Sequence, residues 1–135
     1  MSAIGSSIFK ILTDDGDVSA LVAARVYPTF VPQGVAMPAI TYQRIVAVRA
    51  HTIGSTDNMV PATYQINCWA ETYGGARALS EVVRVALNNY TGTVNSVVIQ
   101  AVQLNDEDDI PESIAGDDVL NRYGKRLDFK VWFNE

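Results

Sequence analysis

The segment Ala62-Thr63-Tyr64-Gln65-Ile66-Asn67-Cys68-Trp69-Ala70 decides the fold that we expect for this chain. Its side chains alternate with a period of two, which predicts a strand with one buried face. The buried set is Tyr64, Ile66 and Cys68, and the opposite set is Gln65, Asn67 and Trp69. Thr72 follows as the N-cap of a helix that runs to about Asn88. The buried stripe of this helix is Ala76, Leu79, Val83 and Leu87.

Towards the N-terminus, the pattern predicts a helix, a short helical turn and a partner strand. The opening helix has one apolar stripe, made of Ile4, Ile8, Ile11 and Leu12. Gly16 is expected to end this helix, and Asp17 to cap the short turn that follows. Ala39 to Ala50 alternates as a long strand does, although neither of its sides is cleanly apolar. His51 to Asn58 is polar and contains a glycine, which predicts a hairpin loop between the two strands.

Towards the C-terminus, the sequence predicts two more strands. Val94 to Leu104 is rich in β-branched residues and is expected to be the third strand. Asn105 to Asp118 is acidic and contains a proline and a glycine, so we expect a loop. Leu120 to Phe133 alternates again and is expected to be the fourth strand. The order α-β-β-α-β-β predicts an α+β fold, a mostly antiparallel four-stranded sheet with helices packed on one face and the other face bare.

Length and composition indicate a single domain, residues 1–135, with an ordinary balance of hydrophobic and charged residues. No run of about 18 apolar residues predicts a membrane span, and the first residues lack the pattern of a signal peptide. The only cysteine, Cys68, cannot form an internal disulfide, which fits synthesis in a reducing cytoplasm. The formal net charge of −5 argues against tight binding of DNA through its phosphates.

Few residues of this chain could carry catalysis. His51 is the only histidine and lies in a polar loop, where a solvated residue is the simplest interpretation. Cys68 alternates with the apolar set, which indicates a core residue and not a reactive thiol. The acidic run 105–109 lacks the spacing of a calcium loop, and Gly74-Gly75 lacks the lysine of a phosphate-binding loop. We therefore expect no enzyme, no cofactor and no metal site.

Two tryptophans lie on the polar sides of their strands. Because tryptophan is costly to expose and is enriched where proteins meet, this pattern predicts a contact surface on the bare face of the sheet. The alternatives are a loop folded over the indole rings, or a position of each ring at a strand end beyond the core. The candidate interface residues are Trp69, Trp132, Gln65, Asn67, Arg122, Arg126, Asp128 and Lys130. A second candidate contact is the hairpin loop, with His51, Thr52, Ser55, Asp57 and Asn58.

The order and spacing of several segments resemble the tail-completion, or tail-terminator, proteins of long-tailed phages and gene-transfer agents. The likeness includes the opening helix, followed by Val18, Leu21 and Arg25-Val26-Tyr27-Pro28. It continues with Tyr42-Gln43-Arg44 after Pro38. It then follows residues 64–70 and Thr72-Tyr73 into the central helix, and it ends with residues 126–132. The resemblance covers nearly the whole chain, apart from residues 59–61 and 105–118.

The resemblance implies a structural subunit of the virion tail or neck, assembled in the host cytoplasm. Six copies would form a homohexameric ring at the head-proximal end of the tail, stop growth of the tail tube and offer the head connector or adaptor a surface to bind. The implied partners are sister copies, the tail-tube protein and the connector, while DNA would pass through the lumen without specific binding. Two alternatives stay open: a head-completion or connector-adaptor protein of the neck, and a small ligand-binding domain or enzyme, which would need a concave site with convergent polar groups.

Overall fold

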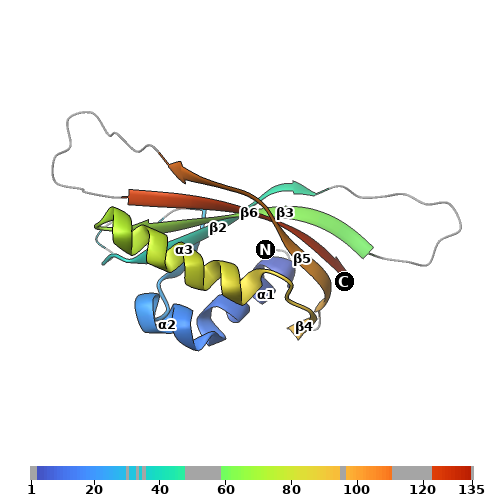
Figure 1. The fold of residues 1–135 in the computed structure, drawn as a ribbon. Helices are drawn as coiled ribbons and strands as arrows, with labels where there is room; N and C mark the ends of the chain where they lie inside the picture. Colours follow the sequence, from blue (N-terminus) through green and yellow to red (C-terminus); the bar gives the residue numbers. More distant parts are fainter. Residues whose placement is uncertain are drawn as a thin grey trace, which may run out of the picture.

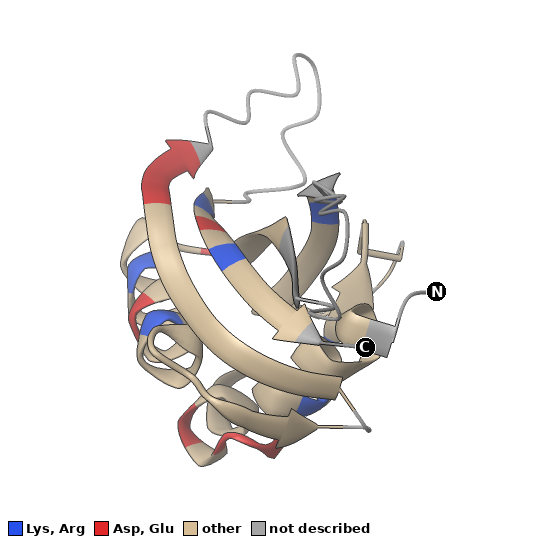
Figure 2. Ribbon diagram, turned by 90° about the vertical axis from the view of Figure 1, so that its right-hand side faces the viewer, with Lys and Arg blue, Asp and Glu red and all other residues tan. Residues whose placement is uncertain are grey.

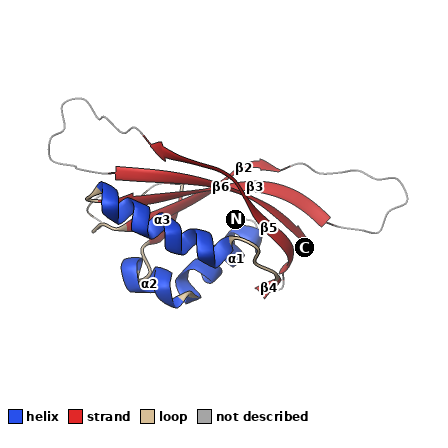
Figure 3. Cartoon of the chain, in the orientation of Figure 1, coloured by secondary structure: helices blue, strands red, loops and turns tan. Residues whose placement is uncertain are grey.

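The computed structural model describes residues 3–29, 31–32, 34, 36–47, 59–94, 97–110 and 123–134. The elements in this part of the chain are α1 Ala3–Asp14, α2 Gly16–Val22, β1 Val26–Pro28, β2 Ala39–Ala47, β3 Met59–Ala70, α3 Tyr73–Leu87, β4 Gly92–Val94, β5 Val97–Ile110 and β6 Tyr123–Asn134. The predicted α+β class is confirmed, and the helices lie together on one side of the sheet (Figures 1 and 3). None of these helices is long and apolar enough to span a membrane.

The sheet has six strands in the order β1-β2-β3-β6-β5-β4, and not the four that we expected (Figure 1). The predicted strands are β2, β3, β5 and β6, and each neighbouring pair among them is antiparallel. β1 adds a parallel strand beside β2, and β4 adds an antiparallel strand beside β5. Each added strand has three residues, which is too short to show a two-residue period. The sheet is therefore mixed.

The expectation of a loop from Asn105 onwards was wrong. Asn105–Ile110 continues β5 and pairs with β6, with Asp108 opposite Arg126 and Asp109 opposite Lys125. The acidic side chains are tolerated in a strand because basic residues stand across from them on β6. The rest of the expected loop, 111–118, lies outside the described residues, as do residues 48–50 at the end of the first expected strand.

The boundary between α1 and α2 also differs from the prediction. α1 ends at Asp14, and Gly16 is the first residue of α2. Asp15, with extended backbone angles, caps α2: its Oδ1 accepts hydrogen bonds from the backbone N–H groups of Asp17 and Val18, both at 3.0 Å. Asp17 is thus in the first turn and not the cap, because the capping oxygen must come from the residue just before the helix.

The predicted start and buried stripe of α3 are confirmed. Thr72 accepts a hydrogen bond on Oγ1 from the N–H of Gly75 at 3.0 Å. All four residues of the predicted stripe are buried. Leu79, Val83 and Leu87 pack with α1 and α2 against the helix-facing side chains of the sheet. From β6, these side chains are Leu127, Phe129, Val131 and Phe133. One continuous core thus lies between the helices and one face of the sheet.

The sheet curls around the helices (Figure 2). α1 contacts β1 near one edge of the sheet and β4 and β5 near the other. The buried hydroxyl of Ser7 in α1 also donates to the carbonyl oxygen of Val94 in β4, at 2.8 Å. The helix-facing side is therefore the inner, concave face. We call the opposite side the outer face; its side chains on the long strands include Thr41, Gln43, Gln65, Asn67, Trp69, Asp106, Asp108, Arg126, Asp128, Lys130 and Trp132.

Candidate interaction surface

Strand register brings most of the predicted interface residues together on the outer face. Gln65 stands opposite Asp128, and Asn67 stands opposite Arg126, across the central pair β3–β6. Lys130 and Trp132 follow on β6, and Trp69 lies towards the other end of β3. Arg122 and the loop residues His51, Thr52, Ser55, Asp57 and Asn58 lie outside the described residues. The outer face is thus one polar surface with an indole ring towards each end.

The two indole rings are half-buried and point away from the helices. Trp69 donates a hydrogen bond from Nε1 to Oγ1 of Thr41, at 3.2 Å, and Thr41 is buried. The ammonium group of Lys130 lies 5.1 Å from the ring centroid of Trp132, a cation–π contact. Both rings are therefore held in fixed positions by polar neighbours while part of their apolar surface remains open.

Two acceptor oxygens on this face lack donors among the described residues. They are Oδ1 of Asn67, a side chain that is 9% exposed, and Oδ1 of Asp128. Burial raises the pKa of the Asp128 carboxyl, and Asp106 and Asp108 raise it further, while Arg126 acts in the opposite direction. Next to them, Gln43 donates from Nε2 to Oε1 of Gln65 at 2.9 Å. The centre of the outer face therefore offers acceptors in excess of donors.

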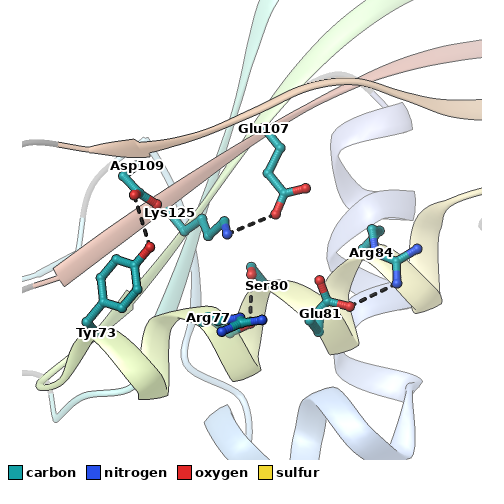
Figure 4. Close-up of polar contacts among 8 residues, drawn as sticks. All are labelled: Tyr73, Arg77, Ser80, Glu81, Arg84, Glu107, Asp109 and Lys125. Atoms are coloured by element: carbon teal, nitrogen blue, oxygen red, sulfur yellow. Dashed lines mark hydrogen bonds and ion pairs between the residues drawn. The ribbon is translucent and has the colours of Figure 1, made fainter.

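A cluster of polar contacts that we did not predict joins α3 to the acidic part of β5 (Figure 4). Lys125 pairs with Glu107 at 3.0 Å on the inner side, and the hydroxyl of Tyr73 donates to Asp109 at 3.1 Å. The ring of Tyr73 also meets the edge of Tyr123, with centroids 6.4 Å apart. The sequence signal for these contacts was the basic pair Lys125-Arg126 in the strand that follows the acidic run, because a β-hairpin places residues of opposite charge across from each other.

On the outer side of the same strands, Arg126 binds Asp108 through two nitrogens of its guanidinium group. Its Nε donates to Oδ1 of Asp108 at 2.9 Å, and its second nitrogen contacts the other oxygen. Both side chains are about half exposed, at 40% and 50%. Because the pair is exposed to solvent, it adds little to the free energy of unfolding. Its bidentate geometry instead favours the observed register of β5 and β6.

Among the described residues, we find neither a reactive thiol nor a cluster of metal-ligating side chains. Cys68 is fully buried, and burial raises the pKa of its thiol far above the usual range. No group of three metal-ligating side chains comes together within the described ranges. Among the hollows along the described residues are the following two. One, of 420 Å³, lies beside Lys10, Asp14 and Tyr90; the other, of 300 Å³, lies beside Pro28, Thr29, Gln43 and Arg44.

Comparisons with known proteins point to one assembly family. No curated protein matches the sequence. A chain in the solved virion of a native gene transfer agent particle has a similar fold, with a TM-score of 0.75 and 16% identity over 99% of this chain and 98% of that chain. The family model of the tail completion protein gp17 matches residues 6–132. The predicted resemblance is confirmed, and the chain belongs to this family of phage tail and virion assembly proteins.

Proposed function

We propose that this protein is a tail terminator, which forms a ring at the head-proximal end of the tail and stops growth of the tail tube. The observation that carries the proposal is the outer face: a helix-free sheet surface with two fixed, half-buried indole rings and two buried acceptor oxygens that no described donor reaches. Aromatic anchors beside unpaired acceptors are typical of surfaces that another subunit covers. The family membership supplies the setting, a phage tail.

The mechanism is steric and needs no catalytic group. One surface of the ring matches the last ring of tube subunits, and its other surface offers them no site but binds the head connector or adaptor. The partners are therefore sister copies, the tail-tube protein and the connector. DNA passes through the lumen, and the formal net charge of −5 favours passage over adhesion because the phosphates are also negative. Assembly takes place in the host cytoplasm, before the tail joins the head.

Electron microscopy of particles made without this protein tests the proposal. A terminator predicts overlong tails, because nothing stops the tube. Finished tails of normal length without heads would instead support the alternative, a connector-adaptor of the neck. Normal particles would reject both roles.

The contribution of the outer face is tested in the same assay with the double variant Trp69→Ala, Trp132→Ala. We expect overlong tails, because both anchors are lost. The matched control is Val85→Ala, a 68% exposed apolar residue on α3, which should leave tail length normal. Normal tails with the double variant, provided that it folds, would exclude the outer face from assembly without excluding the terminator role.

A further inference from the structure

The two outermost strands are too short to cover the strands beside them. β1 pairs only with Ile40, Thr41 and Tyr42 of the nine-residue β2, and β4 pairs only with Val97–Ile99 of the fourteen-residue β5. Among the described residues, no strand pairs with the edge backbone groups beyond these positions, and an open edge of this kind is a template for another strand. The sheet therefore has two partly open edges, one on each side.

On the first side, the open edge of β2 begins at Arg44. Ile40 donates its N–H to Arg25, and Tyr42 accepts from the N–H of Thr29 at 2.9 Å, so alternate residues direct their backbone groups to this side. The next in the series is Arg44, whose backbone no described strand pairs on this side. The 300 Å³ hollow lies at this point, in line with the end of β1, and the following Ile45 is 46% exposed. This edge carries one exposed cation and no acid in the described part of β2.

On the second side, the edge of β5 is covered as far as Leu104. The N–H of Asn89 donates to the carbonyl of Val102 at 2.8 Å, and the side chain of Asn88 accepts from the N–H of Leu104 at 3.2 Å. Beyond Leu104, the described chain offers no further cover, and Figure 2 shows acidic residues gathered at this end of β5. The acidic residues are Asp106, Glu107, Asp108 and Asp109.

We propose that these two edges join in neighbouring copies of the chain, the open edge of β2 in one copy lying against the acidic edge of β5 in the next. This inference rests on the proposed self-assembly and specifies its contact. Two β5 edges would repel each other, and so would two β2 edges, whereas the unlike edges attract. Arg44 lies on the inner side of its strand, the same side as Glu107 and Asp109. The charges thus select the head-to-tail contact.

A head-to-tail contact of unlike surfaces has a geometric consequence. It repeats from copy to copy, and it closes a ring when the rotation between copies divides a full turn. A contact of like edges would instead stop at a dimer. Edge-to-edge joining also leaves the outer face free of sister copies, so that its indole rings meet the subunits of the adjoining layer.

Charge reversal in the full chain tests the pairing. Arg44→Glu gives a copy with an acidic residue at both edges, and Asp109→Arg gives a copy with a basic residue at both edges. We expect each variant alone to associate about tenfold more weakly than the unmodified protein at low salt. An equimolar mixture of the two should regain association, because every contact then joins unlike edges. Sedimentation and light scattering over a concentration series measure all three samples.

Asp17→Arg on α2 is the control for Asp109→Arg, since it makes the same change in net charge away from both edges. Thermal unfolding checks that each variant folds. Asp109→Asn removes the negative charge that accepts from the Tyr73 hydroxyl without adding a positive one, so it separates weakening of the Tyr73 contact from the effect of charge reversal. Single variants that associate as well as the unmodified protein, or a mixture that stays dissociated, would overturn edge pairing and leave the terminator role standing. An unmodified chain that never self-associates, alone or with tail-tube protein, would overturn the pairing and the ring together.

Discussion

Trp69 and Thr41 are joined by a hydrogen bond across β2 and β3, with the indole Nε1 donating to the threonine Oγ1 at 3.2 Å. The hydroxyl is buried and the ring is half-buried, so this bond fixes the orientation of an aromatic side chain on a face that no helix covers. A ring that is already oriented loses little side-chain entropy when a partner covers it.

Replacing Thr41 by valine should lower the free energy of unfolding by about 1 kcal/mol, because the indole loses its acceptor while the shape of the side chain is kept. Thr41→Ser retains the hydroxyl and should restore most of the loss. Urea denaturation followed by tryptophan fluorescence measures both variants. Equal stability of Thr41→Val and the unmodified protein would show that water replaces this hydrogen bond at no cost.

The capping of α2 gives a second prediction. Asp15→Ala removes the oxygen that accepts from two backbone N–H groups and should cost about 1 kcal/mol. Asp17→Ala removes only a favourable charge in the first turn, worth roughly 0.3–1 kcal/mol. Thermal or chemical denaturation of the two variants side by side should rank Asp15→Ala as the less stable. The reverse order would return the capping role to Asp17.

The paired glycines at the start of α3 are predicted to differ. A methyl group on Gly75 would meet Thr72 Oγ1 at 3.0 Å and Ala70 Cβ at 3.2 Å, so Gly75→Ala should disturb the helix cap and destabilise the protein. A methyl group on Gly74 meets nothing within 4 Å, and Gly74→Ala should be neutral or stabilise by up to about 1 kcal/mol. The melting temperatures of the two variants test this difference. Equal destabilisation by both substitutions would contradict the close approach at Gly75.

Asp128 predicts a dependence of stability on pH. Burial raises the pKa of this carboxyl in the folded state above its ordinary value of 3.8, so the folded protein holds the proton more tightly than the unfolded chain. Above the raised pKa, the ionised group therefore destabilises the fold, and this penalty fades as the pH falls through the raised pKa towards 3.8. Asp128→Asn should accordingly be more stable than the unmodified protein at neutral pH.

The comparison requires urea denaturation at neutral pH and again near pH 4, where the advantage of Asp128→Asn should shrink. Asp106→Asn, across the strand from Asp128, should give a smaller gain of the same sign because it removes one repulsive charge. An advantage of Asp128→Asn that stays constant over this range would attribute it to hydrogen bonding and not to ionisation.

The long elements were predictable because their apolar residues repeat over several periods. Residues 62–70, the α3 stripe and the alternation of Phe129, Val131 and Phe133 all lie as the sequence indicates. The three-residue strands β1 and β4 have no such repeat, and only the tertiary fold positions them. The acidic part of β5 was missed because local composition favours a loop, whereas pairing with Lys125 and Arg126 decides the structure.

The candidate surface was predictable in part. The sequence placed Trp69 and Trp132 on the side away from the helices, and strand register puts them there. The unpaired oxygens of Asn67 and Asp128 depend on distances between strands, which no local pattern contains. The contacts of Tyr73 and Lys125 depend on how α3 crosses the sheet, which is likewise a property of the assembled fold.

The bond between Ser7 and Val94 has a consequence for how the protein is made. It links residues 87 positions apart, so the first helix of the chain cannot complete its packing until the ribosome has synthesised β4. Until then, the apolar side of α1 lacks part of the surface against which it packs in the folded protein. α1 also contacts β1, which lies beside the open edge of β2, and β5, which carries the other open edge, so a copy becomes competent to join others only late in its own synthesis.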